Sequence, residues 1–118
     1  TLKVSDYYQG SPSPIDYSRE GLMRYLGKIS IQEGLSKEMY EQIYKVISCE
    51  SGWNYLVIGD DGKSKGLLQF QKETWDENCY GIYEELNPYS QIECALNMWK
   101  RDMHNRWSCY NILYGNET

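Results

Sequence analysis

The stretch CESGWNYLVIGDDGKSKGLLQF, residues 49–70, decides the fold, because a helical pattern ends in it and two short apolar segments follow. Just upstream, apolar residues recur with the i, i+4, i+7, i+8 spacing of a helix packed on a core: Met39, Ile43, Val46 and Ile47. The next position of this stripe, i+11, is Glu50. The pattern therefore predicts a carboxyl group on the apolar face of a helix, at the end of that helix.

Such a carboxyl group has a distinctive chemistry. Ser36 is a natural N-cap for the helix and Gly52 a natural terminator. Burial of Glu50 and the negative end of the helix dipole would both disfavour the charged form and raise its pKa. A carboxyl group that stays protonated near neutral pH can act as a general acid. The alternative is a frayed last turn with Glu50 in water.

The remaining elements complete an α+β fold that is mostly α. Two strands, Tyr55–Ile58 and Gly66–Phe70, are expected to form one small hairpin around an acidic turn. Further helices are expected over Ser18–Ser30, Glu73–Cys79 and Asn87–Trp107, followed by a short tail, and residues 1–17 are expected to form an extended arm or linker. The domain would then cover residues 18–118.

Length and charge narrow the class of protein. The 118 residues are enough for one domain, and we expect a monomer. A net charge of −5 argues against binding to a nucleic-acid backbone. No apolar run approaches the ~20 residues of a transmembrane helix. Four cysteines without a CxxC spacing and a single histidine do not make a zinc site, so we expect no metal and no cofactor.

Several motifs together resemble a known family. ESGWN, GLLQF, NPYSQIECALNMW and YN occur in the order seen in lysozyme-like lytic transglycosylases, and GDDGKSKGLLQF is similar to a stretch of goose-type lysozymes. The resemblance covers roughly residues 37–111. It implies a lysozyme-like domain that acts on peptidoglycan in a secreted, periplasmic, cell-wall or virion-associated setting.

The resemblance also implies roles for individual residues. Glu50 would be the catalytic acid, and the groups that contact substrate or orient the cleft would be Ser51, Gln69, Tyr110 and Asn111. With one carboxyl group, Glu50 would act as acid and then base and release a 1,6-anhydro sugar. Two alternatives stay open. Asp60 could position a water for hydrolysis, as the goose-type likeness implies, or the domain could be a non-catalytic module that binds glycan or serves a structural role.

The four cysteines are expected to form two disulfides, since an even count in a small domain is typical of proteins from oxidising compartments. Four cysteines allow three connectivities. We expect Cys49–Cys109, which would hold the tail against the Glu50 helix, and Cys79–Cys94, which would join the short helix to the long one. The alternative is four free thiols in a cytosolic or virion protein.

Overall fold

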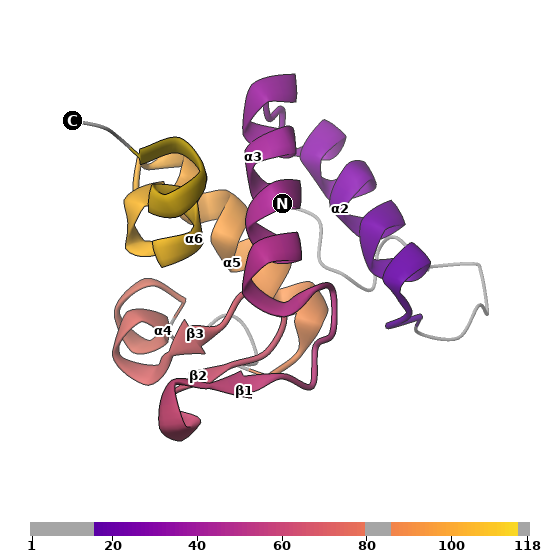
Figure 1. The fold of residues 1–118 in the computed structure, drawn as a ribbon. Coiled ribbons are helices and arrows are strands. Elements are labelled where there is room, and N and C mark those ends of the chain that lie inside the picture. The colour runs from indigo at the N-terminus through magenta and orange to yellow at the C-terminus, as the bar shows by residue number, and fades with distance from the viewer. Residues whose placement is uncertain (1–15, 80–85, 116–118) are drawn as a thin grey trace.

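The computed structural model describes residues 16–79 and 86–115, which form a mostly helical domain with a small antiparallel sheet (Figure 1). In chain order the elements are α2 (Arg19–Gln32), α3 (Lys37–Ser51), β1 (Ile58–Gly59), the 3₁₀ turn η1 (Asp60–Gly62), β2 (Ser64–Lys65), β3 (Phe70–Gln71), α4 (Lys72–Asn78), α5 (Pro88–Lys100), the 3₁₀ turn η2 (His104–Arg106), α6 (Ser108–Tyr110) and the π-helical turn η3 (Asn111–Gly115). This confirms the coarse α+β class. No helix within the described ranges is both long and apolar enough to span a bilayer.

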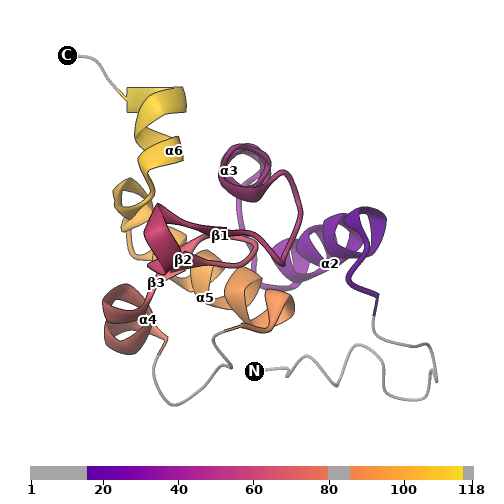
Figure 2. The same cartoon turned by 60° about the horizontal axis from the view of Figure 1, so that its bottom comes forward.

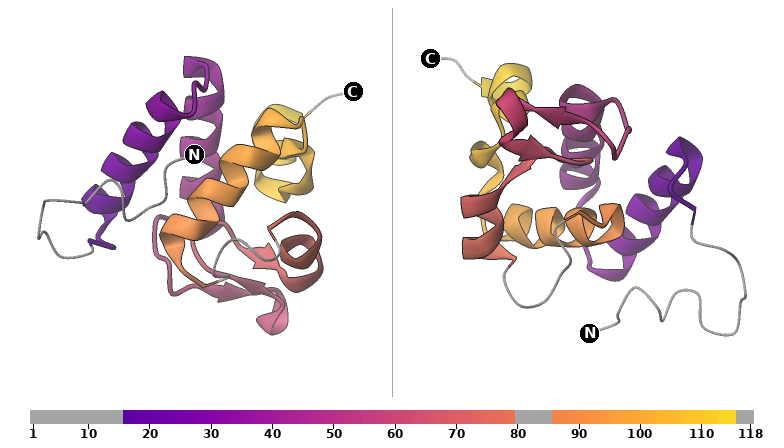
Figure 3. Two further views of the ribbon diagram at one scale, coloured as in Figure 1. Left: turned by 180° about the vertical axis from the view of Figure 1, so that it is seen from behind. Right: turned by 90° about the horizontal axis from the view of Figure 1, so that it is seen from below.

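Helix α5 lies at the centre of the core. Of its residues, ten are buried, among them Ile92, Leu96 and Trp99. Helix α2 packs on both α3 and α5, and α2 and α6 lie on opposite sides of α3 (Figures 1 and 2). From behind, α5 is seen to cross the molecule between the helices and the sheet (Figure 3). The buried faces of three helices therefore meet in one core.

The predicted hairpin was wrong in its strand bounds and in its number of strands. Three two-residue strands pair in the order β1-β2-β3, with Ile58 opposite Lys65 and Lys65 opposite Phe70. The apolar run Gly66–Gln69 forms a turn and not a strand. Its Leu67 and Leu68 are fully buried, so their apolar character comes from burial in the core and not from strand pairing.

The turn after β2 is held by side chains from three other parts of the chain. Gln91 of α5 is fully buried, accepts a hydrogen bond from the Leu68 backbone N–H at 2.8 Å and donates to the Lys65 carbonyl at 3.1 Å. Ser51 Oγ donates to the Leu67 carbonyl at 2.6 Å, and Trp107 Nε1 donates to the Leu68 carbonyl at 2.8 Å. These bonds satisfy the backbone of a segment that is buried without regular pairing.

The long C-terminal helix ends earlier than predicted, and the tail is helical. Asn87 caps α5 and Pro88 occupies its first turn, as the sequence indicates. The helix stops at Lys100, and Asp102 then adopts a left-handed φ of 59°. The chain turns back through η2 into α6 and η3, so the short tail that was expected is helical. This reversal brings residues 106–109 toward the end of α3.

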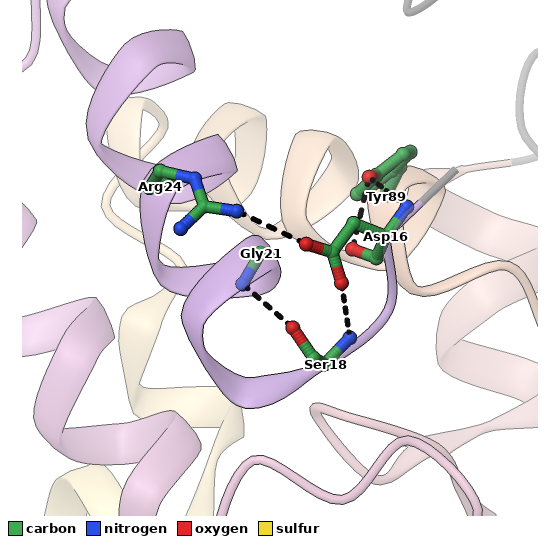
Figure 4. A network of polar contacts seen from close by, with 5 residues as sticks. All are labelled: Asp16, Ser18, Gly21, Arg24 and Tyr89. Atoms are coloured by element: carbon green, nitrogen blue, oxygen red, sulfur yellow. Dashed lines mark hydrogen bonds and ion pairs between the residues drawn. The ribbon is translucent and has the colours of Figure 1, made fainter. Parts of the chain in front are cut away.

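The domain begins slightly before the predicted boundary at residue 18. Ser18 caps α2, and its own N–H donates to the Asp16 carboxylate, which also pairs with Arg24 at 3.0 Å (Figure 4). The Tyr89 hydroxyl from α5 bonds to both backbone polar groups of Asp16. Tyr17 packs edge-on against the Tyr89 ring, with ring centroids 5.1 Å apart. Asp16 and Tyr17 therefore belong with the domain, while the rest of the predicted arm, residues 1–15, lies outside the described residues.

Two disulfides tie the elements together with the expected pairing. Cys49 at the end of α3 is bonded to Cys109 in α6, and Cys79 after α4 is bonded to Cys94 in α5. Disulfides of this kind are typical of proteins from oxidising compartments. In the chain-entropy model the shorter loop, with a sequence separation of 15, contributes about 3 kcal/mol to the free energy of unfolding.

Candidate functional site

Glu50 lies where the sequence places it, in the last turn of α3. Ser36 caps the start of the helix and Gly52 ends it with a left-handed φ of 61°. The Glu50 side chain is half-buried. One of its oxygens, Oε2, accepts a hydrogen bond from the Cys109 backbone N–H, with a distance of 3.2 Å between nitrogen and oxygen. No other hydrogen bond from the described residues engages the carboxyl group, so its second oxygen remains available to a ligand.

The carboxyl group lines a cleft of about 330 Å³. The lining comes from the end of α3, from the sheet and its turns, from α4, and from the segment between η2 and α6: Glu50, Asp60, Ser64, Gln69, Phe70, Gln71, Thr74, Arg106, Trp107 and Ser108. Most of these side chains are polar. The volume lies at the lower end of the range of small-molecule sites, and the lining is more polar than is usual for them.

The surroundings of Glu50 favour its protonated form. Burial raises the pKa of Glu50 above its ordinary value of 4.5, the hydrogen bond from Cys109 opposes that shift, and the negative charge of Asp60 adds to it. The net direction is upward. A carboxyl group with a raised pKa, at the wall of an open cleft, has the properties of a general acid.

Two lining residues adopt backbone conformations that are rare for residues with a side chain. Asp60 and Gln69 have left-handed φ values of 52° and 51°. Each conformation costs on the order of 1–3 kcal/mol and persists only where the surroundings enforce it. Ser64 Oγ donates to the Asp60 carboxylate, and the Gln69 amide nitrogen donates to the carbonyls of Val57 and Gly66 at 3.0 and 2.9 Å. The sheet therefore fixes both residues at the cleft, although Gln69 uses its amide N–H groups within the protein.

The structure does not bring the other predicted site residues into the cleft lining. Ser51 points to the backbone of the Gly66–Gln69 turn, where it supports the fold. The Tyr110 ring packs at a tilt against His104, with ring centroids 4.4 Å apart, and forms no hydrogen bond to Glu50 among the described contacts. Asn111 is exposed and its amide donates to the Asn105 carbonyl. The group that reaches Glu50 from this segment is the backbone of Cys109.

Sequence reasoning missed the far wall of the cleft. Arg106 is the cation among its described lining residues, and it lies 3.9 Å from the Glu77 carboxylate in an exposed pair. Gln71, Thr74 and Ser108 add neutral polar groups. Only tertiary structure brings these positions together, because they come from β3, from α4 and from the reversed chain after α5. No local spacing in the sequence marks them.

A second half-buried carboxyl group provides a contrast. Burial also raises the pKa of Glu93 on α5, opposed by the hydrogen bond from the Tyr25 hydroxyl and reinforced by the charge of Glu33. Glu93 is absent from the lining of the Glu50 cleft. A raised pKa alone thus does not distinguish Glu50. Its position at a cleft does.

Compared with protein-family models, curated proteins and solved structures, the chain gives no match. What this cleft can do is therefore inferred from its own residues.

Proposed function

We propose that this protein cleaves the β-1,4 bond between N-acetylmuramic acid and N-acetylglucosamine in peptidoglycan, with Glu50 as acid and then base. The observation that carries the proposal is the half-buried Glu50 carboxyl group, with a raised pKa, at the wall of a polar cleft. The resemblance of residues 37–111 to lysozyme-like lytic transglycosylases supplies the substrate class. Two disulfides fit a protein that works outside the cytoplasm, where peptidoglycan is found.

In the proposed reaction, protonated Glu50 donates its proton to the glycosidic oxygen as positive charge develops on the muramic acid ring. The resulting carboxylate then removes the proton of the 6-hydroxyl group of the same sugar. That oxygen closes onto the anomeric carbon and gives a 1,6-anhydro product without consuming water. The one group returns to its protonated state, so a pKa tuned toward neutrality serves both steps.

This scheme predicts that the rate of cleavage depends on pH. The first step requires the protonated carboxyl group, so cleavage falls as the pH rises through the raised pKa of Glu50. That fall lies above the ordinary value of 4.5. The test of the proposal is to incubate the protein with purified cell-wall sacculi across this pH range and to measure soluble glycan fragments. If no fragments are released at any pH, the domain is a glycan-binding or structural module instead.

One observation favours a second candidate, a hydrolytic lysozyme. Asp60 lines the same cleft as Glu50, and its charge raises the pKa of the Glu50 carboxyl group. A second carboxylate could position or activate a water, as in glycosidases that use two carboxyl groups. Asp60 is, however, already held by Ser64 and shapes the turn of the hairpin.

Replacement of Asp60 separates the two candidates. If Glu50 acts alone, Asp60→Asn reduces the rate of cleavage by less than about tenfold, because the amide still accepts the Ser64 hydrogen bond. If Asp60 assists a water, the loss is on the order of 10²-fold or more, the contribution of a general base. The rate of fragment release from sacculi measures this, with Asp61→Asn in the same turn as the matched control.

A further inference from the structure

The disulfide Cys49–Cys109 and the Glu50 carboxyl group form one local structure. Cys49 directly precedes Glu50 at the end of α3, and the partner cysteine is the same residue whose backbone N–H reaches Glu50 Oε2. The two Cα atoms of the disulfide are 6.0 Å apart although 60 positions separate them in the sequence. A covalent bond and a hydrogen bond thus join the same two short segments side by side.

The hydrogen bond depends on where α6 sits. Its N···O distance of 3.2 Å is at the long end of the usual range, so a small outward movement of α6 breaks it. Trp107 anchors the start of α6 through its bond to the Leu68 carbonyl and is 4% exposed. Beyond Cys109, by contrast, Ile112 is 75% exposed. We expect the Trp107 anchor to persist without the disulfide, whereas the Cys109 N–H loses its covalent tether and keeps the weaker support of Tyr110, whose ring packs against Trp99 and His104.

We propose that the Cys49–Cys109 disulfide is a positioning element of the cleft, which holds the Cys109 N–H on the Glu50 carboxylate and sets how readily that group gains and loses its proton. As regards catalysis, this inference rests on the proposed function. A donor to the carboxylate stabilises the charged form and so lowers the pKa, against the burial and the Asp60 charge that raise it. The charged groups that face Glu50 across the cleft are Asp60 from η1 and Arg106 from η2.

The chain contains a matched control in its second disulfide. Cys79 and Cys94 are 1% and 0% exposed, join α4 to α5, and are absent from the lining of the Glu50 cleft. Cys49, in contrast, is exposed. Both disulfides stabilise the fold, but only one carries the donor to Glu50. An effect specific to the first pair is therefore an effect on Glu50 and not on general stability.

The test uses two double variants, Cys49→Ala/Cys109→Ala and Cys79→Ala/Cys94→Ala. Alanine at position 109 keeps the backbone N–H, so the first variant removes the tether and not the donor. The pKa of Glu50 is measured by carbon-13 NMR titration of its side-chain carboxyl, assigned with Glu50→Gln. We expect a higher pKa in the first variant and the wild-type value in the second.

Cleavage of sacculi gives the second readout. In the first variant we expect the fall in activity at high pH to move to higher pH. We also expect kcat to drop about tenfold because the acid is misplaced, while KM stays within about twofold of the wild-type value. The control variant keeps the wild-type pH profile. An unchanged Glu50 titration in a folded first variant, or equal shifts in both variants, would overturn the proposal.

If the first variant does not fold, partial reduction replaces it. Dithiothreitol delivers two electrons and two protons to the Cys49–Cys109 bond, giving two thiols while the reagent closes to its own cyclic disulfide. The exposure of Cys49 makes this bond the first to react, and peptide mapping verifies it. The same rise in the Glu50 pKa is expected, and its absence overturns the inference. The NMR titration needs no activity, so a wild type that fails to cleave sacculi refutes the proposed function alone.

Discussion

Glu50→Gln is expected to abolish cleavage of peptidoglycan, with a loss of about 10³-fold or more, because the group that gives and then takes the proton is gone. The amide has the shape of the protonated carboxyl group and can accept the same hydrogen bond from Cys109. The cleft should therefore keep its form and its affinity for glycan. Fragment release from sacculi measures the loss, and a pull-down with insoluble cell wall measures the retained binding.

The control for this variant is Glu93→Gln. Glu93 is also half-buried and also has a raised pKa, but it accepts a hydrogen bond from Tyr25, is influenced by the charge of Glu33 and does not line the Glu50 cleft. Its replacement should leave cleavage within about twofold of the wild-type rate, as for changes away from the site. Comparable activity in Glu50→Gln, or an equal loss in both variants, would contradict the assignment of Glu50 as the acid.

Glu50→Gln also tests the protonation state of Glu50, through the thermal stability of the protein. Because its pKa is raised in the folded state, the stability that the protonated form contributes is complete below the ordinary value of 4.5 and is lost as the pH rises through the folded pKa. Glutamine does not undergo this loss. Glu50→Gln should therefore have a higher Tm than the wild type at pH 7 and a difference that shrinks toward pH 4. A variant less stable than the wild type at pH 7 would show that the carboxylate is stabilised by the fold.

Gly66→Ala is expected to lower the free energy of unfolding by about 3 kcal/mol. Gly66 has a φ of 87°, and a Cβ atom there would lie 2.4 Å from the buried Gln91 Nε2. The backbone conformation costs roughly 1–2 kcal/mol for alanine, and the clash costs about 1–3 kcal/mol more. The displaced amide would also release Lys65 and Leu68. Urea unfolding followed by circular dichroism measures the change.

Gly27→Ala is the matched control for Gly66→Ala. Gly27 lies inside α2, and beyond its chain neighbours and the adjacent backbone of that helix no described atom lies within 4 Å of the Cβ that alanine would add. The same substitution should there stabilise the protein by about 0.5–1 kcal/mol, because alanine is the better helix former. If the two variants had similar free energies of unfolding, the close approach of Gln91 to Gly66 would not be a determinant of this fold.

Local signals in the sequence predicted the helix that carries Glu50. The cap at Ser36, the apolar spacing and the terminator Gly52 act within one helix, so neighbouring residues suffice to place Glu50 at its end. The sheet was harder, because apolar residues of the Gly66–Gln69 turn are buried without being paired. A local pattern does not separate these two causes of apolar character.

The sequence nevertheless contains a signal for the side chain that supports the Gly66–Gln69 turn. Gln91 shares a face of α5 with Cys94, Ala95 and Met98, at i, i+3, i+4 and i+7, and all four are buried. A glutamine on an otherwise apolar stripe indicates a buried amide that must find backbone partners. The role of the Cys109 backbone left no such trace, since a main-chain N–H has no side-chain signature and is placed only by the disulfide and the turn after α5.

The most direct test of the central claim, that Glu50 alone carries out the reaction, is mass spectrometry of the fragments released from sacculi by the wild-type protein. A reaction that uses one carboxyl group as acid and then base closes the muramic acid ring on itself. The account therefore predicts muropeptides that end in 1,6-anhydro-N-acetylmuramic acid, each lighter by one water than a hydrolysis product. Fragments that end in reducing N-acetylmuramic acid would contradict it and assign the attack to a water positioned at Asp60.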